Sequence, residues 1–278
     1  VGGSGFMGSH TADELTHRGF RVVIYDQEQS PWQSDDQEMV VGDILDLEAL
    51  GSALKGARFL YHFAGIADIE ESRSRPFETI NLNIMGAATT LEAARLAGVE
   101  RFLYASTMYV YSPFGSFYRA SKQSAETIIE AYHERYKLDY TLMRYGSLYG
   151  PRAQSWNGLR KYVSEVVKTG KLEYFGTGRE RREYIHVKDA ARLSVDVLDE
   201  QYKNQAITVT GLQVLNSREL IELIFEIAGT SERIDATPDI NNNLLFGPSV
   251  EDTENITDFE ISQNLINKFF PLIKSYFP

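Results

Sequence analysis

The chain has 278 residues, and its 28 Lys and Arg against 39 Asp and Glu give a formal net charge of −11 at pH 7. This acidic balance argues against nucleic acids and anionic membranes as partners, since both are bound by clustered Lys and Arg, and the absence of cysteine excludes disulfides and thiolate metal sites. The five histidines lack metal-ligand spacing, so no metal is predicted. Hydrophobic residues make up 43% of the chain, and no apolar run reaches the ~20 residues that a membrane span requires. This composition is typical of a globular chain of one or two domains.

Val1 stands directly before a glycine-rich turn. Such a turn normally follows a strand, of which this chain has only the last residue. We therefore expect roughly five or more residues of a first strand to precede Val1 in the natural protein.

Strands and helices alternate over the first 150 residues. Apolar runs predict strands at 20–25, 39–41, 58–63, 101–105 and 140–144. Helical spacing predicts helices at 9–18, 45–54, 77–97 and 118–136. This alternation is typical of a parallel sheet covered on both faces, so we predict a Rossmann-like, doubly wound α/β fold that binds its ligand at the carboxyl ends of the strands.

The pattern becomes less regular after Gly150-Pro151. We predict a sheet domain over 1–150 and a smaller C-terminal, substrate-binding domain over 151–278. A segment at about 183–211, with a strand at 207–210, is expected to return to the sheet. Residues 235–248 are predicted as a loop, and the apolar spacing of 257–278 suits a closing helix.

Gly2, Gly5 and Gly8 form a G-x-x-G-x-x-G turn between a strand end and a helix. Glycines let the backbone approach a pyrophosphate, and the helix N-terminus offers free N–H groups. Asp26 ends the next strand, where a carboxylate accepts hydrogen bonds from ribose hydroxyls and repels a 2′-phosphate. This context favours a dinucleotide-binding turn over a plain tight turn, and a ribose-binding role for Asp26 over a solvated loop carboxylate. Because the carboxylate repels a 2′-phosphate, the predicted cofactor is NAD rather than NADP.

Tyr118 and Lys122 lie four residues apart in a predicted helix. A nearby ammonium favours the phenolate, so we expect a lowered pKa for Tyr118 and a role in moving the proton of an alcohol during hydride transfer. Thr107, at the end of a strand, can hydrogen-bond the reacting oxygen or simply cap the strand. Tyr184 and Lys188 have the same spacing but lie beyond the domain change, so a structural role is predicted for them.

Taken together, these features resemble the NAD-dependent nucleotide-sugar epimerase/dehydratase family of the extended short-chain dehydrogenase/reductase superfamily. The resemblance covers residues 1 to about 228. Its further marks are Gly42-Asp43, Ala64-Gly65, Asn83-x-x-Gly86, Ser106-Thr107 with Val110-Tyr111, Arg144-Tyr145-x-x-x-Tyr149-Gly150-Pro151-Arg152, and Arg182 to Val187 before Asp189.

The resemblance implies roles for residues outside the first turn. It implies that Asp43 and Ile44 lie near the adenine and that Ala64 and Gly65 border the pyrophosphate and ribose. Lys122 would also bond the nicotinamide ribose. The remaining residues assigned to cofactor binding on this basis are Phe6, Met7 and Asn83.

The same resemblance implies substrate-binding residues. Arg182 matches the arginine that grips the nucleotide-sugar diphosphate, although a surface Arg beside Glu180 and Glu183 is the alternative. Tyr174 and Phe175 lie where the family holds the base, although an apolar core strand fits them nearly as well. Ser147 stands where the family commonly has an Asn that contacts the substrate.

Met108 and Tyr109 follow Thr107, at positions where dehydratases of this family carry Asp-Glu and decarboxylases need a Glu. Neither side chain can serve as that acid or base. By exclusion we predict an NAD-dependent nucleotide-sugar epimerase, most simply a 4-epimerase that works through a transient keto-sugar. The alternatives are a nucleotide-sugar dehydrogenase or reductase with net cofactor turnover, and a non-catalytic NAD-binding protein.

The helices predicted at 77–97 and 118–136 carry apolar residues beyond one face. The resemblance implies that this pair forms a four-helix interface, so we expect a homodimer; packing on the monomer's own sheet is the alternative. We expect a cytoplasmic location.

Overall fold

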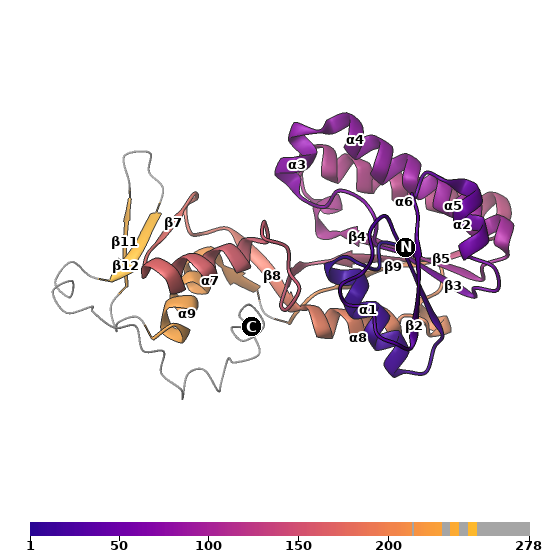
Figure 1. The fold of residues 1–278 in the computed structure, drawn as a ribbon. Coiled ribbons are helices and arrows are strands. Elements are labelled where there is room, and N and C mark those ends of the chain that lie inside the picture. Colours follow the sequence, from indigo (N-terminus) through magenta and orange to yellow (C-terminus); the bar gives the residue numbers. More distant parts are fainter. Residues whose placement is uncertain (213, 230–233, 239–243, 249–278) are drawn as a thin grey trace. The chain divides into compact units, whose positions relative to one another are not determined.

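The computed structural model describes residues 1–212, 214–229, 234–238 and 244–248, and these residues form two compact units (Figure 1). The first unit comprises Val1–Gly146 and Val187–Thr210. The second comprises Ser147–His186 and the described residues from Gly211 onward. The helix predicted at 257–278 lies outside the described residues.

The first unit is built on parallel strands. Its sheet has the order β3-β4-β5-β9, and β1 pairs with β2. The bounds are β1 (Val22–Asp26), β2 (Gln37–Val41), β3 (Phe59–His62), β4 (Arg101–Thr107), β5 (Asp139–Tyr145) and β9 (Gln205–Val209). Val1 connects the two groups of strands, because its backbone bonds Tyr61 and Phe63 of the β3 segment while the N–H of Gly2 donates to Tyr25 of β1.

Helices cover both faces of this sheet (Figure 1). One side carries α2 to α6 and the other carries α1 and α8. The bounds are α1 (Phe6–His17), α2 (Leu47–Ala53), α3 (Ile69–Ser74), α4 (Pro76–Ile80), α5 (Gly86–Ala97), α6 (Ser116–Tyr136) and α8 (Val187–Asp196). The prediction of a doubly wound α/β fold is confirmed.

The helix predicted at 77–97 is interrupted. It consists of α4, a π-helical turn at Asn81–Met85 and α5. A π turn inserts one extra residue per turn and often marks a functional site. Here it contains Asn83, which is buried. Hydrophobic spacing alone does not reveal such a turn, because the turn is defined by its backbone hydrogen bonds.

The core of the first unit explains why the strands are so apolar. Leu91 of α5, Phe102 of β4 and Leu142 of β5 are fully buried in one cluster. Burying side chains of this size stabilises a fold by about 1.5–3 kcal/mol each. The buried face of α6 is made by Ser121, Lys122, Ala125, Glu126 and Ile129, which recur at helical spacing.

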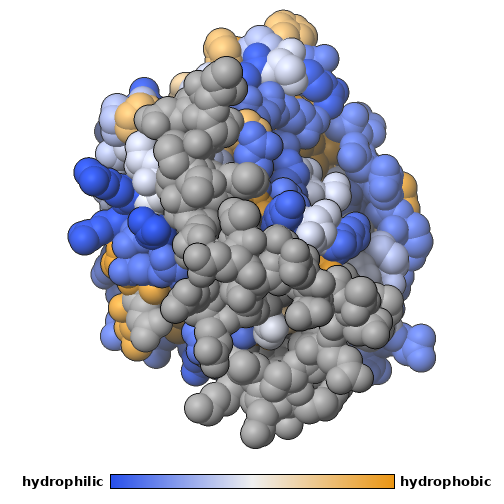
Figure 2. Space-filling model, turned by 90° about the vertical axis from the view of Figure 1, so that its left-hand side faces the viewer, coloured by the Kyte–Doolittle hydropathy of each residue, from blue (hydrophilic) through white to orange (hydrophobic). Residues whose placement is uncertain are grey.

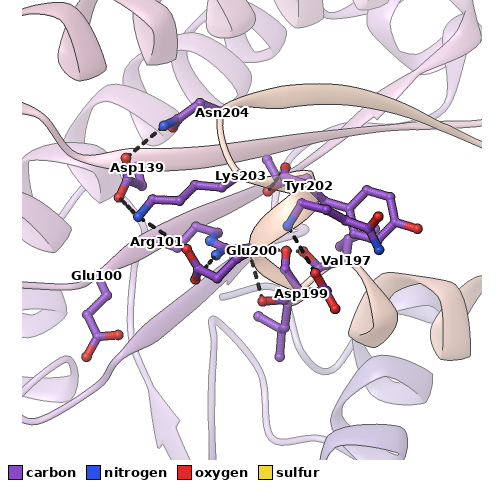
Figure 3. Close-up of polar contacts among 12 residues, drawn as sticks. Glu100, Arg101, Asp139, Val197, Asp199, Glu200, Tyr202, Lys203 and Asn204 are labelled. Atoms are coloured by element: carbon purple, nitrogen blue, oxygen red, sulfur yellow. Dashed lines mark hydrogen bonds and ion pairs between the residues drawn. The ribbon is translucent and has the colours of Figure 1, made fainter.

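The segment after α8 is anchored at the amino-terminal edge of the sheet (Figure 3). Arg101 opens β4 and is only 2% exposed. Its guanidinium donates to the carbonyls of Val197, Leu198 and Asp199 and to Glu200, at 2.6–3.2 Å. Three of these acceptors are backbone carbonyls of the turn that follows α8, and the fourth is the Glu200 carboxylate. The chain then continues into β9, which pairs in parallel with β5.

The second unit has two small sheets and two helices among the residues that the structure describes. The sheets have the orders β10-β8-β6 and β11-β12-β7. The bounds are β6 (Ser147–Tyr149), α7 (Gly158–Thr169), β7 (Leu172–Tyr174), β8 (Arg181–His186), β10 (Val214–Asn216), α9 (Ser217–Ile227), β11 (Ile234–Pro238) and β12 (Leu244–Pro248). The core of this unit is formed by apolar residues of α7, α9 and β7.

The prediction of a loop is wrong for residues 235–238 and 244–248. β11 and β12 cover these residues and pair antiparallel, and β12 also pairs with β7 from Leu244↔Tyr174 to Phe246↔Leu172. The residues around Pro238 and Pro248 have a composition typical of turns, so local propensity favoured a loop. The strands form because distant backbone groups pair, which composition does not encode.

Hydrophilic residues dominate the described surface on the face that Figure 2 shows, and hydrophobic residues are scattered among them. This distribution agrees with the acidic, charge-rich composition. Among the described residues, no helix is both long and apolar enough to cross a membrane.

Candidate active site

The glycine turn leaves no room for side chains at two positions. Gly2 has φ +78°, which favours glycine, and a Cβ there would lie 2.4 Å from the backbone nitrogen of Ala64. A Cβ on Gly8 would lie 2.1 Å from the carbonyl oxygen of Gly2. The backbone is therefore packed as closely as a pyrophosphate-binding turn requires.

Helix α1 begins directly after this turn. Its N-cap is Gly5, and no side chain caps it. The first-turn N–H groups and the positive end of the helix are therefore available to an anion. Phe6 and Met7 are buried, so the groups that they can offer a cofactor are backbone N–H groups. The turn and helix fit the pyrophosphate of a dinucleotide.

Asp26 closes β1 beside the turn. Its carboxylate accepts a hydrogen bond of 2.9 Å from the N–H of Ser4. This bond orients the carboxylate at the carboxyl edge of the sheet, where ribose hydroxyls are bound in folds of this type.

We expect Asp26→Asn to reduce the preference for NAD over NADP by roughly tenfold, because it removes the negative charge that repels a 2′-phosphate. The amide oxygen can still accept from Ser4. The dissociation constants of both cofactors, measured by isothermal titration calorimetry, test this prediction. Glu28→Gln removes an exposed charge two residues away and is the control; equal shifts in both variants would contradict a specific role for Asp26.

Asp43 and Ile44 follow β2. The Asp43 side chain accepts a hydrogen bond of 2.9 Å from the N–H of Leu45, and the Asp43 backbone carbonyl accepts one of 2.8 Å from the Tyr25 hydroxyl. Ile44 is buried against Gly86, where a Cβ would lie 2.4 Å from the Ile44 Cδ1. These contacts fix the loop that the resemblance assigns to the adenine.

Asn83 holds the loop after β3. Its Oδ1 accepts from the N–H of Ile66 at 2.7 Å, and its Nδ2 donates to the Ile66 carbonyl and to Ser121 of α6, both at 2.9 Å. The side chain is therefore bonded within the protein and positions Ala64 and Gly65, rather than reaching outward itself. Gly65 has φ +129° and approaches Asn83 too closely for a side chain.

Three candidate catalytic groups come together at the end of β4. The Tyr118 side chain hydrogen-bonds Thr107. Lys122 lies one turn further along α6, with its ammonium 5.9 Å from the centre of the Tyr118 ring. It donates to the Ala105 carbonyl at 2.7 Å. One strand end and one helix thus position a hydroxyl, a phenol and an ammonium together.

The expected lowering of the Tyr118 pKa is not observed. Burial raises the pKa of Tyr118 to about 12, and the hydrogen bond to Thr107 offsets this only in part. Burial also lowers the pKa of Lys122 to about 8. The expectation was wrong because the ammonium is directed at Ala105 rather than at the phenol, and because desolvation disfavours both charged forms.

Tyr109 lies beside the Tyr118 phenol. Its ring packs edge-on against Tyr118 with 6.3 Å between ring centres. Gly115, the N-cap of α6, lies close to this ring, and its lack of a side chain leaves room for the ring. An aromatic group therefore occupies the neighbourhood where a carboxylate would be needed for elimination or decarboxylation.

Sequence reasoning missed a charged network behind these groups. Glu126 of α6 accepts from Ser106 of β4 at 2.5 Å and from Arg144 of β5 at 3.1 and 2.6 Å. The spacing of Glu126, four residues after Lys122, was the available signal. It places both residues on the same face of α6.

The residues expected to bind substrate lie in the second unit. Ser147 opens β6, and Arg182 is an exposed residue of β8. Tyr174 belongs to the core, with its hydroxyl bonded to Glu180 and Ser217 at 3.0 and 2.8 Å. Phe175 is 75% exposed. Their roles toward a substrate remain predictions.

The second Tyr–Lys pair has a different geometry. Tyr184 lies on β8 and Lys188 on α8. The change from strand to helix between them means that the four-residue spacing does not place them on one helix face. Tyr184 packs against the core of the second unit.

Comparisons with known proteins agree with the first unit's architecture. The model of the NAD dependent epimerase/dehydratase family matches residues 1–210. A UDP-N-acetyl-alpha-D-glucosaminuronate decarboxylase of Bacillus cytotoxicus is 26% identical over 86% of this chain and 82% of its own length. A dTDP-D-glucose 4,6-dehydratase of Mus musculus is 26% identical over 84% of this chain and 74% of its own.

Solved structures show the same similarity. The UDP-glucose 4-epimerase of Thermotoga maritima, solved with UDP-glucose, has a TM-score of 0.77 and 25% identity, covering 84% of this chain and 82% of its own. The UDP-glucose 4-epimerase of Thermus thermophilus, solved with NAD, has a TM-score of 0.74 and 26% identity, covering 87% and 86%. The prediction of NAD as cofactor is confirmed, because the matched family is NAD dependent.

Proposed function

We propose that this chain, which belongs to the NAD dependent epimerase/dehydratase family, is a nucleotide-sugar epimerase that acts most simply at C4. The observation that carries the proposal is the hydrogen bond between Thr107 and Tyr118 with Lys122 one helical turn away. This arrangement can remove the proton of a sugar hydroxyl. Two of the similar solved structures are UDP-glucose 4-epimerases.

Each residue has a defined part in the proposed reaction. Tyr118 takes the proton of the reacting hydroxyl and later returns it, while Thr107 holds that oxygen in line. The Lys122 ammonium, which donates to the Ala105 carbonyl and lies 5.9 Å from the centre of the Tyr118 ring, adds a longer-range stabilisation of negative charge on the phenol. Bound NAD would supply reversible hydride acceptance, and the turn from Gly2 to Gly8 together with Asp26 would hold it.

The side chains after Thr107 support an epimerase over the other reactions of the relatives. Dehydration and decarboxylation need an acidic residue that Met108 and Tyr109 do not provide. Epimerisation needs only a proton shuttle, a hydride acceptor and room for the keto-sugar to turn. A dehydrogenase or reductase would use the same three residues but would change the cofactor's redox state.

The test is incubation with UDP-, GDP- and dTDP-sugars, followed by NMR of the products and absorbance at 340 nm. We expect a new sugar stereoisomer without net NADH. Stoichiometric NADH formation or consumption would favour the dehydrogenase or reductase and contradict the epimerase. If Tyr118→Phe kept full biological activity, a non-catalytic NAD-binding protein would be the better description.

The outer side of α4, α5 and α6 supports the proposal of a homodimer. Phe77, Met85, Leu96 and Tyr136, on these helices and the π turn between α4 and α5, are between 48% and 78% exposed. Apolar exposure of this kind favours association. Light scattering at micromolar concentration should give twice the chain mass; a monomeric mass would contradict the proposal.

A further inference from the structure

We propose that Glu126 is a positioning residue that keeps Lys122 charged and fixes the end of β4 that carries Thr107. The inference deepens the proposed function and rests on it for its catalytic meaning. Its structural part concerns only the protein's own residues, so it can be tested without any substrate.

Glu126 is a buried carboxylate on the face of α6 that packs on the sheet. It is 7% exposed and lies between the buried residues Ala125 and Ile129 in the helix. A carboxylate in such a place is costly unless it is paired and hydrogen-bonded. Its Oε1 accepts hydrogen bonds from the Ser106 hydroxyl and from Nε of Arg144, and its Oε2 accepts one from Nη2 of Arg144. Both oxygens of the buried carboxylate are therefore hydrogen-bonded.

The bond to Ser106 connects Glu126 with two catalytic groups at once. Ser106 stands between Ala105, whose carbonyl accepts from Lys122, and Thr107, which bonds Tyr118. Ser106 also pairs directly with Arg144 in the β4–β5 register. A single carboxylate therefore fixes the strand position from which both Lys122 and Tyr118 are oriented.

The surroundings of Lys122 give this carboxylate its electrostatic effect. The other titratable groups that face the ammonium are His62 of β3, Tyr104 of β4 and Tyr118 of α6. All three are neutral at pH 7, because burial lowers the pKa of His62 and raises the pKa of both tyrosines. Glu126 is thus the negative charge that opposes the desolvation of Lys122.

Arg144 balances the carboxylate and extends the network. Its guanidinium lies 4.8 Å from the centre of the Tyr111 ring and also bonds the Tyr111 hydroxyl. Tyr111 closes the 3-10 turn at Met108–Tyr111 that follows Thr107. The network therefore fixes the chain on both sides of Thr107.

The experiment follows Lys122 directly. Protein labelled with [13Cε]lysine is titrated by NMR, and the Lys122 signal is assigned with Lys122→Met. In Glu126→Gln we expect the Lys122 pKa to fall by about one unit below that of the unaltered protein, because an opposite charge is removed from a desolvated ammonium. Glu126→Asp, which keeps the charge, should restore most of the difference.

Two controls separate charge from packing. Glu130→Gln removes an exposed carboxylate from the next turn of α6 and should leave the Lys122 titration unchanged. Arg144→Gln removes a positive charge from the same network, so the Lys122 pKa should stay constant or rise. A fall in both Glu126→Gln and Arg144→Gln, or no fall in Glu126→Gln, would overturn the proposal.

Turnover provides a second readout. Because Lys122 must be protonated to stabilise the phenolate, Glu126→Gln should lose activity at lower pH than the unaltered enzyme, with kcat reduced more at pH 8 than at pH 6.5 and KM little changed. If no nucleotide-sugar is turned over at all, the proposed function fails while the NMR titration still decides the role of Glu126.

Discussion

Tyr118→Phe is expected to lower kcat by roughly a thousandfold, because it removes the hydroxyl that takes the substrate proton. NAD binding should persist, since the cofactor turn is elsewhere in the unit. The measurements are steady-state kinetics with the nucleotide-sugar found in the NMR screen and calorimetric titration of NAD.

Tyr184→Phe is the matched control for this experiment. It removes a phenol that also precedes a lysine by four residues, yet lies on a strand of the second unit. We expect kcat close to that of the unaltered enzyme. A large loss in Tyr184→Phe with little loss in Tyr118→Phe would reverse our assignment of the catalytic tyrosine.

The pH dependence of activity follows from the two shifted groups. A Tyr118 pKa of about 12 leaves the phenol neutral at pH 7, so activity should rise with pH as the phenolate fraction increases. Loss of the Lys122 proton near pH 8 should offset this increase, so the profile should level off near pH 8. A kcat that continues to rise with the phenolate fraction well above pH 8 would contradict the requirement for the Lys122 charge.

Gly8→Ala is expected to weaken NAD binding by roughly tenfold or more. A Cβ at this position would lie 2.1 Å from the Gly2 carbonyl oxygen and 2.9 Å from Gly3 Cα, so the turn must open to accept it. The N–H groups at the start of α1 would then lose their alignment toward the pyrophosphate. Calorimetry measures the effect, and circular dichroism establishes that the variant is folded.

Gly51→Ala provides the control for that substitution. Gly51 lies inside α2, and a Cβ there meets no atom within 4 Å. Alanine is favoured over glycine in a helix by about 1 kcal/mol, so we expect an unchanged NAD affinity and a slightly raised melting temperature. Unaltered NAD affinity in Gly8→Ala would show that the close approach of the turn is not needed for binding.

The main elements of the first unit were predictable because their signals are local. Apolar runs predicted β3, β4 and β5 to within two residues at either end, and helical spacing predicted α6. The candidate site was partly predictable for the same reason: Tyr118 and Lys122 are neighbours on one helix. Asn83 was associated with the cofactor through resemblance, but its bonds to Ile66 and Ser121 depend on elements that meet only in the fold.

By itself, the sequence determined the parallel α/β class, the glycine turn with Asp26, and the spacing of Tyr118 and Lys122, since backbone stereochemistry and hydrophobic periodicity act over a few residues. Only the tertiary structure decided the pairing of β12 with β7, the direction of the Tyr118 pKa shift and the ion pair of Glu126 with Arg144. Each of these depends on burial or on contact between residues far apart in the chain, and neither quantity is written in a local pattern.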